Sequence, residues 1–423
     1  MVASPSFSKL FQYGLIAFPL AFAGLPIYLH APDFYARGLQ IPIETIGAAL
    51  LFLRLFDAIQ DPIIGDLSDR FNHKRSQIIC LGALMLTGGM WMIFHPIQTI
   101  PLLWLCLSVL ICTTGFSIVS INVQALGGLW RIDSQYVPSV MGVREALGLC
   151  GLLVASITPP ALLQLYGLEI AFHYLTLGFV PLMILCVMVF LGWLQSAPLA
   201  KPKQKATTIS FRDILHGSRA KLFFTGYFLS TVASSIPATL IIFYVRDYLQ
   251  AEAYLGLFMI IYFLSGAATM PLWIKIAKNR STLTSWWISM ILACVTFIWA
   301  FILNPGDLVG YGLVCLMSGI AVGANLTLPS AIAAHLFSGK SHHQAASRYY
   351  AFMAFLAKVS LAMATGIALP LLGLLGYQPG DVTKGILMPT AYALIPCAIQ
   401  LVAISVLWRL IQIEKGNNND TIP

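Results

Sequence analysis

Long apolar stretches recur along this sequence and limit, more than any other feature, what it can fold into. Twelve of them, bounded by charged or turn-forming residues, lie near 10–30, 42–65, 77–95, 100–127, 138–163, 169–194, 220–245, 253–274, 283–303, 308–335, 348–375 and 386–411. A membrane-spanning helix needs about 20 mostly apolar residues. Barrel strands are shorter and alternate in polarity, so these stretches are helices. The sequence predicts an all-α membrane protein of about twelve spanning helices.

The composition supports a membrane protein and predicts its orientation. The chain is 58% hydrophobic and 9% charged, whereas soluble domains are about 25% charged. If the N-terminus is cytoplasmic, 18 of the 24 Lys and Arg residues lie on the cytoplasmic side and three on the opposite side. This asymmetry predicts a multi-pass inner (plasma) membrane protein with both termini in the cytoplasm. It also accounts for the net charge of +8 without a nucleic-acid partner.

The sequence divides into two similar halves. A polar stretch at 196–219 separates six apolar segments in 1–195 from six in 220–423, and the last segment is followed by a short tail. We interpret 196–219 as a cytoplasmic linker between two six-helix bundles. Pro62 and Pro271 lie near the ends of corresponding segments of the two halves, and internal repetition of this kind is typical of secondary transporters. All eight cysteines fall inside apolar segments, so we expect buried thiols and no structural metal site.

The segment 42–65 carries ionisable residues that are costly within a membrane. At about 100° per residue, Arg54, Asp57, Asp61 and Gly65 fall within roughly an 80° arc of one helix. Two carboxylates one turn apart repel each other unless a bound cation or a shared proton relieves them. Intramembrane charges are functional candidates by default, so Asp57 and Asp61 are predicted to bind a coupling cation, Na⁺ or H⁺. The alternative is an internal salt bridge in which Arg54 and a lysine neutralise both acids for assembly alone.

Other charged residues extend this hypothesis. Lys358 lies about ten residues inside its apolar segment and is a candidate counter-charge. Arg144 is either a second charge partner or, with Glu145, only an interfacial pair. The stretch GDLSDRFNHKRS at 65–76 suggests a conformational latch between helix ends, in which Asp69 and Arg70 pair across neighbouring helices. The predicted latch residues are Gly65, Asp69, Arg70, Lys74 and Arg75.

The motifs in this region resemble those of a known superfamily. GDLSDRFNHKR is similar to the signature between helices 2 and 3 of the major facilitator superfamily. More narrowly, RLFDAIQDPIIGDLSDR at 54–70 resembles the glycoside–pentoside–hexuronide:cation symporters, the melibiose-permease-like family. The resemblance implies a twelve-helix fold of two six-helix bundles, with the coupling cation held by Asp57 and Asp61. It also implies that Lys358 and Arg144 correspond to the family's lysine and arginine, and that Ser117 stands where the family places a hydroxyl beside the ion.

The sequence departs from this family at the substrate site. The family holds its sugar with acids in helices 1 and 4, but the segment 10–30 has no acid and Ser120 stands at the helix 4 position. A sugar substrate is therefore not implied. Asn122 and Gln124 could face the substrate path together with Ser120, or bond between helices. Ser117 has a helix-packing role as its alternative.

The leading hypothesis is a cation-coupled secondary active transporter, a symporter of a small organic solute that works by alternating access. The alternatives are a proton-coupled exporter, a transporter of an amphipathic or lipid-like substrate, and a non-transporting sensor. An enzyme is disfavoured because HExxH and GxSxG are absent and SGKS at 338–341 follows Ala334 in place of the required glycine. We expect no cofactor beyond Na⁺ or H⁺, contact with membrane lipid, no nucleic acid, and a monomer.

Overall fold

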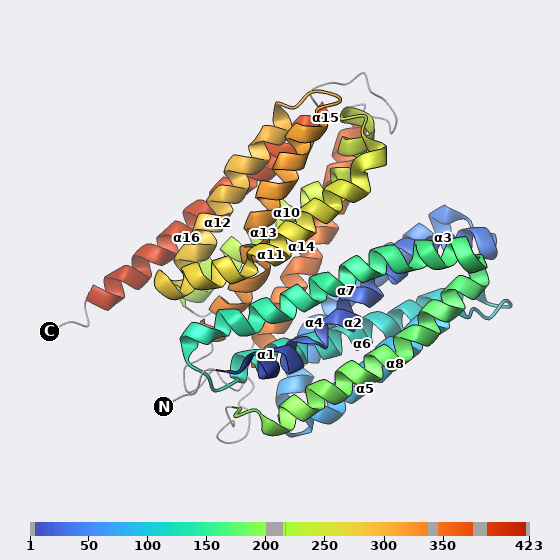
Figure 1. The fold of residues 1–423 in the computed structure, drawn as a ribbon, viewed down its shortest axis with the longest axis horizontal. Helices are drawn as coiled ribbons and strands as arrows, with labels where there is room; N and C mark the ends of the chain where they lie inside the picture. Colours follow the sequence, from blue (N-terminus) through green and yellow to red (C-terminus); the bar gives the residue numbers. More distant parts are fainter. Residues whose placement is uncertain (1–4, 200–214, 216, 337–345, 375–386, 420–423) are drawn as a thin grey trace. The chain divides into compact units, whose positions relative to one another are not determined.

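The computed structural model describes residues 5–199, 215, 217–336, 346–374 and 387–419, and these are almost entirely helical (Figure 1). Contacts divide the chain into two compact units. The first comprises Met1–Thr207 and Ala333–Phe355, and the second comprises Thr208–Ile332 and Leu356–Pro423. Most of the predicted linker at 196–219 lies outside the described residues. The predicted division at 195 and 220 stays a prediction, and the structure adds that the described residues 333–336 and 346–355 group with the first unit.

The first unit contains the first six predicted helices. The segment predicted at 10–30 is a broken helix, because Pro26 has no backbone N–H and begins a π-helical turn. Its pieces are α1 (Phe7–Gly14), α2 (Ala17–Leu25), η1 (Pro26–His30) and α3 (Ala31–Gly38). The following helices are α4 (Ile43–Arg70), α5 (Arg75–Phe94), α6 (Pro101–Leu129), α7 (Val137–Tyr166) and α8 (Leu168–Ser196). Each coincides with one of the apolar segments.

The second unit contains most of the remaining helices. They are α10 (Ser218–Phe243), α11 (Leu255–Asn279), α12 (Thr282–Phe297), α13 (Leu308–Leu336), α14 (Ala346–Leu374), α15 (Leu387–Pro389), the π-helix η8 (Thr390–Leu394) and α16 (Ile395–Asn419). The end of α13 and the first turns of α14 belong to the first unit. Within the described residues, the twelve predicted segments are therefore all helical.

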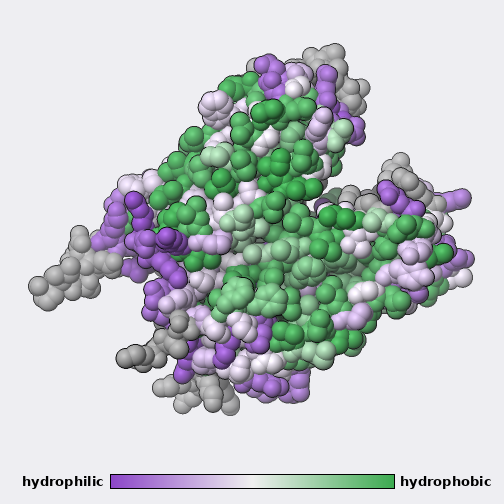
Figure 2. All heavy atoms as spheres, in the orientation of Figure 1, coloured by the Kyte–Doolittle hydropathy of each residue, from purple (hydrophilic) through white to green (hydrophobic). Residues whose placement is uncertain are grey.

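The helix surfaces are those of a membrane protein. Within the part of the chain that the structure describes, nine helices are long and apolar enough to cross a membrane. Large apolar side chains such as Leu84, Leu185 and Leu313 are exposed on them. Figure 2 shows hydrophobic residues over the lengths of the helices and hydrophilic residues gathered near helix ends. Such a surface is stable in lipid and not in water.

Each unit has its own aromatic core. In the first, Tyr13 packs against Trp193 with ring centroids 4.9 Å apart, and its hydroxyl donates to the carbonyl of Val123 at 3.1 Å. In the second, Tyr244 stacks on Tyr392 with centroids 4.0 Å apart. Buried tyrosines with satisfied hydroxyls fix the positions of the helices that carry them.

Candidate functional site

The paired carboxyl groups of α4 are buried. Asp61 is 0% exposed and Asp57 is 5% exposed, while their neighbours Ile59 and Ile63 are 62% and 59% exposed. The two acids are therefore on the buried side of α4, and cation binding by them stays a prediction. The two carboxyl groups lie one turn apart on one helix, away from bulk solvent.

A short polar chain holds the Asp57 carboxylate in place. Gln60 Nε2 donates to Asp57 Oδ1 at 2.7 Å, and Ser117 Oγ of α6 donates to the same oxygen at 3.4 Å. Thr114 Oγ1, one turn before Ser117, donates to Gln60 Oε1 at 2.8 Å. The predicted neighbour Ser117 therefore does lie beside Asp57. These two hydrogen bonds orient the Asp57 carboxylate relative to α6.

The predicted charge partners occupy three different environments. Arg54, one turn before Asp57, is exposed along α4. Arg144 of α7 is buried and forms an ion pair with Glu145, the pair that the sequence offered as one alternative. Lys358 is partly buried and belongs to the second unit. Its pairing with the carboxylates stays a prediction.

A buried charge cluster lies where α4 ends and α14 begins. Asp69 Oδ1 accepts a hydrogen bond from Arg75 Nη2 at 2.9 Å. The same carboxylate accepts from the backbone N–H of Ser347 at 3.1 Å and of Arg348 at 3.0 Å. These amides belong to the first turn of α14, whose N–H groups lack partners within their own helix. Asp69 therefore caps a helix that is remote from it in sequence, and its charge also favours that helix dipole.

Arg70, the other residue expected to pair across helix ends, pairs within its own helix. Arg70 pairs with Asp66 at 2.7 Å, one turn earlier on α4, and Asp66 also pairs with Arg348. Asp69 and Arg70 are adjacent in a helix, so their side chains point about 100° apart. For that reason Asp69 meets Arg75 and Arg70 meets Asp66. Lys74 is exposed beside the cluster.

Gly65 allows α4 to approach α14 closely. A Cβ atom at this position would lie 2.5 Å from the Cβ of Ala351 and 3.0 Å from the carbonyl oxygen of Ser347. Both distances are shorter than ordinary van der Waals contact. The absence of a side chain at Gly65 therefore permits the contact through which Asp69 reaches the start of α14.

The three polar residues expected near a substrate path lie on α6. Asn122 is 0% exposed, and its Nδ2 donates to Ser68 Oγ at 2.9 Å. This bond favours the interhelical alternative for Asn122. Gln124 Nε2 donates to Ser120 Oγ at 3.0 Å, and both residues are partly exposed. Contact of Ser120 or Gln124 with a substrate stays a prediction.

Sequence reasoning missed three residues of this site: Gln60, Thr114 and Asp66. Gln60 is a polar residue between the two aspartates, three positions after Asp57. Thr114 precedes Ser117 by three positions, so both lie on one face of α6. Asp66 precedes Arg70 by four positions, the spacing of a helical ion pair. Helical spacing from residues already identified was the signal that could have found all three.

Comparisons with known proteins agree with this architecture. A family model described as MFS/sugar transport protein matches residues 10–415. No curated protein matches the sequence. A bacterial homologue of the iron transporter ferroportin, in an outward-facing state, is similar in structure, with TM-score 0.70, 16% identity, and coverage of 96% of this chain and 99% of that chain.

Two further solved structures are also similar. The human organic anion transporter MFSD10 has TM-score 0.67 and 15% identity, with coverage of 95% of this chain and 98% of that one. The E. coli fucose:proton symporter has TM-score 0.67 and 14% identity, with coverage of 95% and 97%. At these identities the likeness concerns the fold alone. The family model that matches most of the chain is that of a transporter and not of an enzyme.

Proposed function

Because this chain belongs to the family of MFS/sugar transport proteins, we propose that it is a secondary transporter that couples the movement of a small organic solute to Na⁺ or H⁺. The observation that carries the proposal is the buried pair of carboxylates, Asp57 and Asp61, one turn apart on α4. Their energetic requirement for a positive charge is the basis of coupling.

The physical argument starts from the cost of burying two like charges. An ionised carboxylate taken out of water costs several kcal/mol unless it is paired. Two of them one turn apart add mutual repulsion, so a cation or a proton at this site stabilises the conformation that forms it. Carboxylate and hydroxyl oxygens are suitable ligands for a hard cation, and Asp57, Asp61 and Ser117 would supply them. A conformation favoured by the ion is what alternating access needs.

The narrower family assignment is part of this proposal. The motif of Arg54, Asp57 and Asp61 supports a glycoside–pentoside–hexuronide:cation symporter, in which Lys358 would be the counter-charge that replaces the ion when the site empties. The missing acids at helix 1 and at Ser120 argue against recognition of a sugar through carboxylates. Exchange against protons, with export of the solute, is the competing mechanism. We also propose an inner-membrane monomer with cytoplasmic termini, from the Lys and Arg asymmetry.

Ion binding can be tested without knowing the solute. The melting temperature of the purified protein would be followed against Na⁺, Li⁺ and K⁺ at several pH values. A ligand at ten times its dissociation constant stabilises the folded state by about 1.4 kcal/mol. We expect a shift with Na⁺ or Li⁺ but not K⁺, absent in Asp61→Asn. The matched control is Asp133→Asn, which removes the same charge from an exposed position.

Each outcome distinguishes the mechanisms. A pH-dependent shift that Asp61→Asn abolishes, without an ion effect, indicates proton coupling and favours the exporter. Melting temperatures that respond to neither ion nor pH, in wild type and variant alike, would overturn the proposal. The remaining explanation of Asp57 and Asp61 would then be the structural salt bridge with Arg54 and a lysine.

A further inference from the structure

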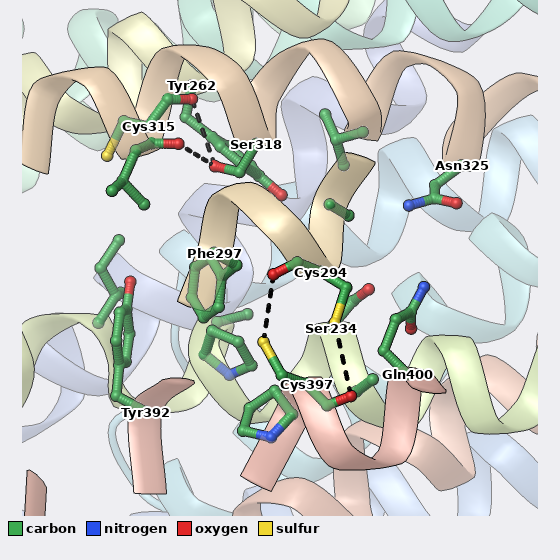
Figure 3. A pocket seen from close by; sticks show the side chains of 18 of the residues that line it. Ser234, Tyr262, Cys294, Phe297, Cys315, Ser318, Asn325, Tyr392, Cys397 and Gln400 are labelled. Atoms are coloured by element: carbon green, nitrogen blue, oxygen red, sulfur yellow. Dashed lines mark hydrogen bonds between the residues drawn. The ribbon is translucent and has the colours of Figure 1, made fainter. Parts of the chain in front are cut away.

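The second unit contains a partly open cavity of about 170 Å³, drawn in Figure 3. Its walls come from α10, α11, α12, α13, η8 and α16. All of its lining residues belong to the second unit. The cavity therefore belongs to a different unit from Asp57 and Asp61.

The wall of this cavity is uncharged and rich in aromatic rings. No charged side chain is among the described residues that line it. Tyr262, Phe263, Phe297, Tyr311 and Tyr392 contribute aromatic surface. An unpaired charge buried against such a wall would cost several kcal/mol. The wall therefore favours a neutral ligand, and its rings favour an aromatic one.

The aromatic wall is fixed before any ligand binds. The hydroxyls of Tyr311 and Tyr392 lie 2.6 Å apart, and one donates a hydrogen bond to the other. Tyr392 also packs against Phe297, with ring centroids 5.2 Å apart. Side chains that are already held in place lose little entropy when a ligand arrives.

Two carboxamides add hydrogen-bonding capacity to the wall. Asn325 Oδ1 accepts from Trp286 Nε1 at 2.8 Å, which orients the Asn325 amide. Gln400 is 5% exposed, and its Nε2 donates to Ser230 Oγ at 3.4 Å. Among the described residues, no donor lies within hydrogen-bond distance of Gln400 Oε1. The Oε1 atom is itself covered in this structure, so a rotation of the carboxamide is needed to bring it to an O–H or N–H group of a ligand. Because a buried acceptor without a donor is costly, that new hydrogen bond would stabilise the bound state.

The volume sets the size of the ligand. An engineered apolar cavity of about 150 Å³ in another protein binds benzene. We propose that the cavity of the second unit is a binding site for a small neutral aromatic molecule that carries a hydrogen-bond donor, the chemistry of a phenol. This site goes beyond the proposed ion coupling and does not depend on it.

Two thiols in the wall provide a direct test. The Sγ atoms of Cys294 and Cys397 each lie against the other residue's carbonyl oxygen, at 3.7 and 3.6 Å, and both residues line the cavity. Labelling by N-ethylmaleimide would be followed by mass spectrometry at each cysteine, with phenol as the probe. At ten times its dissociation constant, phenol should slow labelling of Cys294 and Cys397 about tenfold. Cys112 and Cys186, buried in the first unit, are the internal controls.

Matched probes and variants test each part of the proposal. Toluene has the shape of phenol without the donor, and benzoate adds a charge. Phenol should protect best, and Gln400→Leu should weaken its binding about tenfold while leaving toluene unchanged. Ala233→Phe, which fills the cavity from its wall, should abolish protection by both.

Three results would overturn the proposal. The first is labelling of Cys294 and Cys397 that phenol does not slow, or slows equally at Cys112 and Cys186. The second is protection by benzoate as strong as that by phenol. The third is equal binding of phenol and toluene that Gln400→Leu does not alter. If Ala233→Phe fails to fold, the comparison of phenol with toluene in Gln400→Leu and the labelling of Cys112 and Cys186 still test whether phenol binds in the cavity.

Discussion

Arg75 Nη2 lies 2.9 Å from Asp69 Oδ1, and the two side chains are only 8% and 1% exposed. The pair joins the end of α4 to the beginning of α5 across the turn at 71–74. Because Asp69 also accepts from two amides of α14, three helices meet at one carboxylate. A rearrangement that separates α14 from α4 would break the two hydrogen bonds from the α14 amides to Asp69 together. A latch between two conformations behaves in this way.

The first prediction concerns the removal of the cation from this pair. Arg75→Ala leaves Asp69 buried with its charge uncompensated, and breaking a buried pair in this way costs about 3–5 kcal/mol. We expect a clearly lower melting temperature in detergent. Lys74→Ala is the control, because Lys74 is exposed beside the same turn and should change the stability by less than about 0.5 kcal/mol. Equal effects of the two substitutions would show that Arg75 contributes no more than a surface charge.

The second prediction concerns the close contact of α4 with α14. Gly65→Ala places a methyl group 2.5 Å from Ala351 Cβ, so the helices must separate at a cost of about 1–3 kcal/mol. Gly47→Ala in the same helix meets nothing within 4 Å and should be neutral or stabilising by up to about 1 kcal/mol. Thermal unfolding of both variants measures the difference. A Gly65→Ala protein as stable as Gly47→Ala would mean that the helices do not need this contact.

Much of the fold could be predicted because a membrane leaves few alternatives. Apolar length alone located the helices, and the spacing of Asp57 and Asp61 placed both on one buried face. Contacts between helices could not be predicted in the same way. The amides of Ser347 and Arg348 have no sequence signature as partners of Asp69, because any residue supplies a backbone N–H. Asp69 and Arg70 were both expected to pair across helix ends, but adjacent side chains of a helix point to different neighbours, so Asp69 contacts Arg75 of α5 and Arg70 contacts Asp66 within α4.

The third prediction concerns Lys358. If it is the counter-charge of the coupling site, Lys358→Ala should reduce concentrative uptake of the solute at least tenfold while the amount of folded protein in the membrane changes little. Lys358→Arg keeps the charge and should retain part of the activity. Uptake would be measured beside the folded fraction, which size-exclusion chromatography gives for detergent extracts of the same membranes. Parallel losses of uptake and of folded protein would favour a structural salt bridge instead.

The fourth prediction concerns the hydroxyl beside the carboxylates. Ser117 Oγ lies 3.4 Å from Asp57 Oδ1, so Ser117→Ala removes one donor to the charged oxygen and one candidate oxygen ligand of the ion. A hydrogen bond to a charged group contributes about 1.5–3 kcal/mol, and the variant retains both carboxylates. We therefore expect the ion concentration for half-maximal thermal stabilisation to rise about tenfold or more, with the maximal shift preserved.

The control for this substitution lies three residues further along α6. Ser120 bonds to Gln124 within the same helix, so Ser120→Ala removes the same hydroxyl group without touching Asp57. Its ion titration should follow that of the wild type. Ser117→Thr keeps the hydroxyl and should restore most of the affinity. If Ser117→Ala titrates like Ser120→Ala, the hydroxyl is only a packing group, and the ion is held by the carboxylates of Asp57 and Asp61 without it.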